Sequence, residues 1–275
     1  MAFRIAQISD THLSGEKPFF VANFRRISEA VAREQPDLVV NTGDISLDGA
    51  SGEADLIEAR RLHDAIASPL RCIPGNHDIG DNVDVPELEQ PIDDDRRARY
   101  RRHFGDDWWA TDAPGWLLLG VNAQLLASGL AAAREQSRFV ADALAHAGDR
   151  RIALFIHKPL YDKSEDESHV GGRFLNPAPR RELFETFGVA RPALVASGHV
   201  HQFRASDAGG AHHVWAPSTA FFIPDSRQTR YGSKEIGFVI HELFESGAHA
   251  SRFMRAPGAH DLNIVDFPDA YGPMG

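Results

Sequence analysis

Residues 3–12 read Phe-Arg-Ile-Ala-Gln-Ile-Ser-Asp-Thr-His, a strand-like run that ends in an aspartate and a histidine. After this run, predicted helices alternate with further short apolar runs. Helical spacing of apolar residues over Val21–Glu34 precedes the short apolar run Asp37–Asn41, and Glu53–Ile66 precedes Pro69–Ile73 in the same way. Helices that alternate with short apolar runs predict an α/β fold with buried parallel strands.

The second half of the chain keeps this alternation and then changes to short strands. The predicted elements are helices at Arg134–Ala147 and Arg180–Phe187, and strands at Trp116–Val121, Arg151–Ile156, Ala193–Ser197, Gln202–Ala205, His212–Ala216 and Gly237–Phe244. Such a chain predicts one α/β domain over residues 1–275, with either a mixed sheet or two sheets packed face to face.

Two segments fall outside this alternation. Residues 161–179 are polar and contain glycine, which predicts an insertion that forms a lid or rim loop. From about residue 257 the chain is rich in glycine and proline, which predicts a C-terminal extension that wraps over the domain or frays.

The composition limits the kinds of partner. Hydrophobic residues make up 43% of the chain and charged residues 25%, as in soluble globular proteins. A formal net charge of −10 argues against duplex nucleic acid, whose phosphates need a basic surface. A small anionic substrate remains compatible, because bound cations reverse the local field.

The termini and the cysteine count add further expectations. The N-terminus reads as a strand rather than a secretion signal, and no apolar run reaches the roughly 20 residues of a membrane span. We therefore expect a cytoplasmic protein with no membrane partner. Cys72 is the single cysteine, so a metal ion has to be held by nitrogen and oxygen ligands.

Five polar clusters each follow a predicted strand. They are Asp10-Thr11-His12, Gly43-Asp44-Ile45-Ser46-Leu47-Asp48, Gly75-Asn76-His77-Asp78, His157-Lys158-Pro159 and Gly198-His199-Val200-His201. Ligands of α/β sheets bind at the carboxyl ends of strands, so we expect the five clusters to meet. Carboxylate, imidazole and amide groups are suited to two divalent cations in one site. Alternate residues that leave a strand point the same way, which predicts that Asp10 and His12 converge, as do His199 and His201.

The ordered motifs D-x-H, G-D-x-x-x-D, G-N-H-D, H and G-H-x-H resemble those of the calcineurin-like metallophosphoesterase superfamily. They span residues 10 to 201. In spacing and length, the chain is most similar to the small bacterial class III phosphodiesterases, which include cyclic-nucleotide phosphodiesterases and glycerophosphodiesterases. The resemblance implies a four-layer αββα sandwich, in which two packed mixed β-sheets are flanked by helices. It also implies two divalent or trivalent metal ions, drawn from manganese, iron and zinc.

The resemblance assigns a role to each motif residue. The first ion would be held by Asp10, His12 and His201, and the second by Asn76, His157 and His199. Asp44 would bridge the two ions.

Three further motif residues would surround the ions. His77 would face the substrate as a catalytic residue, Asp78 would orient His77, and Asp48 would brace a metal-binding loop. Lys158 stands where many class III members have a second histidine, so the substrate preference of those members cannot be assumed for this chain.

The implied activity is metal-dependent hydrolysis of small phosphodiesters, with 3′,5′-cyclic nucleotides as leading substrates. Glycerophosphodiesters or phosphomonoesters are the alternative substrates at the same site. A metal-free scaffold protein on this fold is the alternative from another class. It is disfavoured because all seven expected ligand positions hold suitable residues. A homo-oligomer is compatible with the sequence and is left open.

Overall fold

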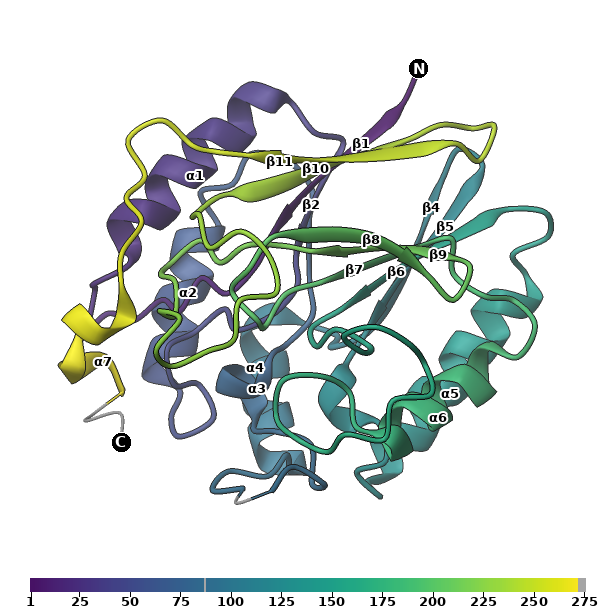
Figure 1. Cartoon of the computed structure of the whole chain (residues 1–275), viewed down its shortest axis with the longest axis horizontal. Helices are drawn as coiled ribbons and strands as arrows, with labels where there is room; N and C mark the ends of the chain where they lie inside the picture. Colours follow the sequence, from purple (N-terminus) through teal and green to yellow (C-terminus); the bar gives the residue numbers. More distant parts are fainter. Residues whose placement is uncertain (87, 272–275) are drawn as a thin grey trace.

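The computed structural model describes residues 1–86 and 88–271, which form two β-sheets packed between helices (Figure 1). The five-stranded sheet has the order β11-β10-β1-β2-β3. Its strands are β1 (Phe3–Ile8), β2 (Leu38–Asn41), β3 (Leu70–Cys72), β10 (Phe238–Leu243) and β11 (His249–Met254). Strand β1 pairs parallel to β2 and antiparallel to β10, so this sheet is mixed.

The six-stranded sheet has the order β4-β5-β6-β7-β9-β8 and is also mixed. Its strands are β4 (Trp109–Ala113), β5 (Trp116–Val121), β6 (Arg151–Ile156), β7 (Leu194–Ser197), β8 (Arg204–Ala208) and β9 (Ala211–Trp215). The helices are α1 (Val21–Glu34), α2 (Ala54–His63), α3 (Asn76–Ile79), α4 (Asp94–Phe104), α5 (Ala131–Ala145), α6 (Pro177–Phe187) and α7 (Pro268–Tyr271), with 3₁₀ turns η1 (Ala123–Leu125) and η2 (Ile264–Asp266).

The apolar residues form one core between the sheets and one on each outer face. Ile5, Val40 and Phe155 belong to the central core, to which both sheets contribute. Helices α1 and α2 cover the five-stranded sheet, and α5 and α6 cover the six-stranded sheet on the opposite side (Figure 1). Because central strands are buried on both faces, they read as continuous apolar runs in the sequence. The expected four-layer arrangement with two mixed sheets is confirmed.

Most predicted elements are present, but some boundaries differ. Helix α2 ends at His63 rather than Ile66, α5 begins at Ala131 rather than Arg134, α6 begins at Pro177 rather than Arg180, and β8 spans Arg204–Ala208 rather than Gln202–Ala205. Strands β4 and β11 were not predicted. Both missed strands lie at a sheet edge and carry charged or small residues at alternate positions. Their pairing with β5 and β10 stabilises them, rather than an intrinsic preference for strand.

No helix of residues 1–86 and 88–271 is long and apolar enough to cross a membrane.

A chain of buried polar groups crosses the interior beside the central core. His241 of β10 contacts the side chains of Gln7 at 2.9 Å and Ser251 at 2.7 Å, and it is fully buried. Gln7 in turn donates to Thr42 and to the backbone carbonyl of Ser197 in the other sheet. Burial, assisted by the charges of His212 and His249, lowers the pKa of His241 to about 3.

We predict that this histidine makes the fold sensitive to acid. Its folded pKa lies below its usual value of 6.5, so the unfolded chain takes up the proton first as the pH falls. The stabilisation is complete above pH 6.5 and is lost progressively between pH 6.5 and 3. One such group costs about 2 kcal/mol of unfolding free energy at pH 5. Urea unfolding at pH 7 and pH 5 measures the loss, which His241→Gln should reduce. An equal loss in that variant would contradict the assignment.

Candidate metal centre

The five polar clusters meet at one end of the two sheets. Asp10 follows β1, Asp44 follows β2, and Asn76 opens the short helix α3 beyond β3. His157 directly follows β6, and His199 lies one residue beyond Gly198 at the end of β7. The expected convergence at the carboxyl ends of the strands therefore occurs, and it draws on both sheets.

One group of donor atoms consists of Asp10, His12, Asp44 and His201, all buried. Nε2 of His12 lies 3.2 Å from Nε2 of His201, and His201 Nε2 lies 3.4 Å from Oδ1 of Asp10. Oδ2 of Asp44 lies 4.0 Å from His12 Nε2. These four side chains are grouped closely enough to hold one metal ion.

A second group shares Asp44 with the first. It contains Asp44, His157 and His199. Nε2 of His157 lies 3.3 Å from Asp44 Oδ2, 3.1 Å from Nδ1 of His199 and 3.2 Å from Oδ1 of Asn76. The seven side chains expected to hold the ions thus form two adjoining groups around Asp44.

The backbone, and not strand alternation, aims these side chains. Of the seven described non-glycine residues with positive φ, five are candidate ligands: Asp10 (53°), His12 (42°), Asp44 (50°), His199 (69°) and His201 (56°). Left-handed backbone is uncommon outside glycine, although aspartate and histidine tolerate it better than most residues. Strand alternation therefore does not orient these side chains, and that prediction is wrong in its mechanism. Asp10 and His12 do meet in one donor group, whereas His199 and His201 belong to different groups. Such conformations persist where the surroundings enforce them, and they concentrate at functional sites.

Two glycines permit this close packing of loops. A Cβ on Gly75 would lie 2.2 Å from Oδ1 of Asp44, and a Cβ on Gly198 would lie 1.9 Å from Oγ of Ser9 and 2.7 Å from Oδ2 of Asp10. These distances are far below contact, so any side chain there would displace the carboxylates.

The electrostatics keep Asp44 ionised. Burial opposes its charge, but the charges of His157 and His77 outweigh burial and hold the pKa of the Asp44 carboxyl well below its usual range. For His157, burial is likewise outweighed, here by Asp44, and the pKa rises to about 9.

Two other imidazoles are neutral. Burial, together with the charge of His77, lowers the pKa of His12 well below 6.5. Burial, with the charges of His157 and Lys158, does the same for His199. Neutral imidazole is the form that binds metal.

The donor set fits two cations. Two ring-nitrogen pairs face each other at 3.2 and 3.1 Å, an arrangement that needs a proton or a cation near the lone pairs. Two carboxylates, four imidazoles and an amide oxygen suit manganese, iron or zinc. The predicted residues therefore fit a binuclear centre.

The aspartate after His77 has a different partner from the one predicted. Asp78 is fully buried and accepts hydrogen bonds from the amides of Ile45, Ser46 and Gly75 and from the Ser46 hydroxyl. It therefore ties the loop after β2 to the loop after β3. The prediction that Asp78 orients His77 is wrong, since both Asp78 oxygens are engaged with these loops.

The ring of His77 is held instead by the loop after β2. Its Nδ1 lies 3.2 Å from the carbonyl oxygen of Leu47, and its backbone amide donates to Oδ1 of Asp44 at 2.9 Å. Asp48 accepts from the Ser51 amide and so closes the turn that follows.

Lys158 is buried and does not face solvent. Its Nζ lies 2.5 Å from Oδ1 of Asp81, and its side chain is 1% exposed. This ion pair joins the loop after β6 to the segment that follows α3, which contains Asp81. Lys158 therefore acts on the site as a buried charge.

Two neighbours of the centre escaped the sequence analysis. Within residues 161–179, the carbonyl of Gly172 lies 2.8 Å from Nε2 of His199. In helix α7, the hydroxyl of Tyr271 lies 2.5 Å from Nδ1 of His12. A backbone carbonyl leaves no sequence signal. Tyr271 stands alone in a tail rich in glycine and proline, so no motif marks it.

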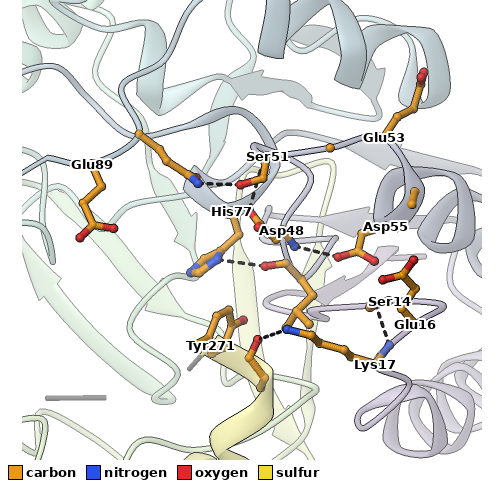
Figure 2. Close-up of a pocket in the computed structure, with 15 residues that line it drawn as sticks. Ser14, Glu16, Lys17, Asp48, Ser51, Glu53, Asp55, His77, Glu89 and Tyr271 are labelled. Carbon is orange, nitrogen blue, oxygen red and sulfur yellow. Dashed lines mark hydrogen bonds between the residues drawn. The ribbon is translucent and has the colours of Figure 1, made fainter. Parts of the chain in front are cut away.

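A cavity of about 700 Å³ opens beside His77 (Figure 2). Its walls come from the loops after β1 and β2, the segment around Gln90 and the end of α7. Five carboxylates line it, with a single lysine: Glu16, Asp48, Glu53, Asp55, Glu89 and Lys17. The cavity therefore presents an acidic wall next to the metal centre.

Residues 3–203 match the model of the calcineurin-like phosphoesterase family. Because this match covers most of the chain, the protein belongs to the calcineurin-like phosphoesterases. It is accordingly a metal-dependent phosphoester hydrolase, as its relatives with phosphodiesterase activity are.

Three relatives indicate the range of the family. The glycerophosphodiester phosphodiesterase GpdQ of Enterobacter lignolyticus is 33% identical over 94% of this chain and 95% of its own. The 3′,5′-cyclic adenosine monophosphate phosphodiesterase CpdA of Pseudomonas aeruginosa is 29% identical over 81% of this chain and 78% of its own. The serine/threonine-protein phosphatase CPPED1 of Bos taurus is 32% identical over 52% of this chain, a match that spans only 44% of CPPED1.

Solved structures share the fold at low identity. A dimetal phosphatase from Danio rerio superposes with a TM-score of 0.61 at 14% identity, over 91% of this chain and 95% of its own. GAP50, the anchor in the inner membrane complex of Plasmodium, superposes with a TM-score of 0.64 at 16% identity, over 100% and 99% of the two chains. At such identities the likeness establishes the fold alone.

We predict that Asp44→Asn weakens both metal ions together, because Asp44 belongs to both donor groups and the amide removes its charge. Asp10→Asn is the matched control and should weaken only one ion, since Asp10 belongs to the first group alone. Titration with Mn²⁺, followed as free ion by EPR, measures the two affinities. Loss of a single ion in Asp44→Asn would contradict the shared role.

Proposed function

We propose that this protein is a binuclear metal-dependent phosphodiesterase that hydrolyses small phosphodiesters. The observation that carries the proposal is the sharing of one buried, ionised carboxylate, Asp44, by two adjoining groups of donor atoms. Asp10, His12 and His201 would complete one ion's shell, and Asn76, His157 and His199 the other's.

Two bound cations supply positive charge for a phosphate group and lower the pKa of water. The protein's own groups then position the substrate and move protons. Nδ1 of His77 is directed at the Leu47 carbonyl, which leaves Nε2 for the substrate in the cavity (Figure 2). Hydrolysis releases an alcohol whose oxygen needs a proton, and we assign its delivery to His77.

The cavity and the relatives favour diesters over monoesters. A phosphomonoester carries up to two charges, whereas a diester carries one, so the five carboxylates of the wall repel a monoester more strongly. GpdQ matches this chain at higher identity and over a larger share than CpdA does. Glycerophosphodiesters are therefore our first candidate substrates, and 3′,5′-cyclic nucleotides the second.

We predict that the enzyme loaded with Mn²⁺, iron or Zn²⁺ hydrolyses glycerophosphocholine faster than p-nitrophenyl phosphate, with cyclic AMP as the third member of the panel. The reason is the acidic wall, which also favours the cationic choline group. Release of choline from glycerophosphocholine, of AMP from cyclic AMP and of p-nitrophenol from the monoester, compared as kcat/KM, ranks the substrates. A preference for the monoester would contradict the assignment, and no hydrolysis of any phosphate compound would refute the proposed function.

We predict that His77→Ala retains both ions while its kcat falls about 100-fold or more, as for a lost acid–base residue. The ring contributes no atom to either donor group, so metal content should remain that of the unmodified protein. Metal analysis of the purified variant and its turnover of glycerophosphocholine, whose alkoxide leaving group needs a proton, measure the two effects. Loss of metal in His77→Ala would mean that this histidine is a ligand.

A further inference from the structure

The four imidazoles of the metal centre differ in what holds their outer nitrogen. Three of them are held by backbone carbonyl oxygens: His157 by Thr42 at 2.8 Å, His199 by Gly172 at 2.8 Å and His201 by Phe221 at 2.9 Å. His12 is held by a side chain, since its Nδ1 lies 2.5 Å from the hydroxyl of Tyr271. A group that orients a metal-binding histidine commonly fixes its tautomer and geometry.

The tautomer of His12 follows from its surroundings. Nε2 faces His201 and Asp44 inside the first donor group. When Nε2 binds an ion, the ring proton resides on Nδ1, and Nδ1–H donates to the oxygen of Tyr271. The hydroxyl hydrogen of Tyr271 is then available to a second partner. His77 is adjacent, with its ring centroid 5.0 Å from that of Tyr271, and both residues line the cavity (Figure 2).

Helix α7 is anchored over this position by its own small core. Phe267, before the helix, packs against Phe19 and Phe20 with ring centroids 5.5 Å apart in each case. Ala270 is buried, and its carbonyl oxygen accepts from Nζ of Lys17 at 3.2 Å. These contacts bring a residue from the far end of the chain against the loop after β1.

We propose that Tyr271 is a positioning residue of the first metal subsite: its hydroxyl orients His12 for metal binding and presents a hydrogen-bond donor to the substrate cavity beside His77. Helix α7 then contributes to the metal centre by supplying Tyr271. This inference rests on the proposed binuclear function. It predicts weaker binding of one ion only, because His157 and His199 of the second donor group are held by carbonyls outside α7.

The test uses Tyr271→Phe in the full chain, with Tyr161→Phe as matched control. Tyr161 makes the same kind of bond, from its hydroxyl to Nε2 of His213 at 2.9 Å, away from the metal centre. Free Mn²⁺ is followed by EPR during titration. We expect one of the two ions of Tyr271→Phe to bind about 10- to 100-fold more weakly, the range for a lost orienting partner. Tyr161→Phe should retain both affinities.

Two further measurements separate positioning from folding. Excess Mn²⁺ should restore metal occupancy in Tyr271→Phe. If Tyr271→Phe lowers the melting temperature more than Tyr161→Phe does, Lys17→Met is used as the test variant in place of Tyr271→Phe. That variant removes the bond to Ala270 but leaves the tyrosine, and we expect a smaller weakening of the same ion.

The outcomes distinguish this inference from the proposed function. Two unchanged affinities in Tyr271→Phe, with phosphodiester hydrolysis intact in the unmodified protein, would overturn the role of Tyr271 alone. Equal weakening of both ions would also overturn it. Failure of the unmodified protein to bind Mn²⁺ would overturn both.

Discussion

The carboxylate of Asp44 lies between two groups of imidazoles, and the neighbouring loops are arranged to keep it buried and charged. A buried carboxylate without partners would take up a proton, because desolvation favours its neutral form. Here the imidazoles and the amide of His77 face it, and Gly75 leaves room for its oxygen. Asp78 draws the amides of Ile45 and Ser46 onto the loop after β3, so the two loops that surround Asp44 form one unit.

Much of the fold was readable from the sequence because its central strands are buried on both faces. Apolar runs such as Arg151–Ile156 and Trp116–Val121 coincide with β6 and β5, and the helical spacing of Val21–Glu34 coincides with α1. The missed strands β4 and β11 lie at sheet edges, where one face or one side is free and the apolar pattern is weak. Their residues are strands because a neighbour offers hydrogen bonds, which is a tertiary effect that local pattern does not contain.

The identity of the site residues could also be predicted from the sequence, but the backbone conformation that orients their side chains could not. Composition and order placed suitable ligands at strand ends, whereas their convergence depends on left-handed backbone at positions such as Asp10 and His199. Side-chain alternation, which the sequence suggested, holds only in extended chain. Tyr271 and the Gly172 carbonyl reach the centre through long-range packing, so neither could be found from residue types and spacing.

Lys158, which follows His157, lies near the metal centre but is not available to bind a phosphate group. A surface lysine there would attract anions, but Lys158 is buried and paired with Asp81, so the pair adds little net charge. Its field still reaches His199 and favours the neutral imidazole that a cation needs. In the function we propose, the leaving group is selected by the cavity walls, where carboxylates outnumber the single Lys17 and α7 contributes the tyrosine. Because α7 comes from outside the five motifs, relatives that share all of them can differ in the wall that the leaving group meets.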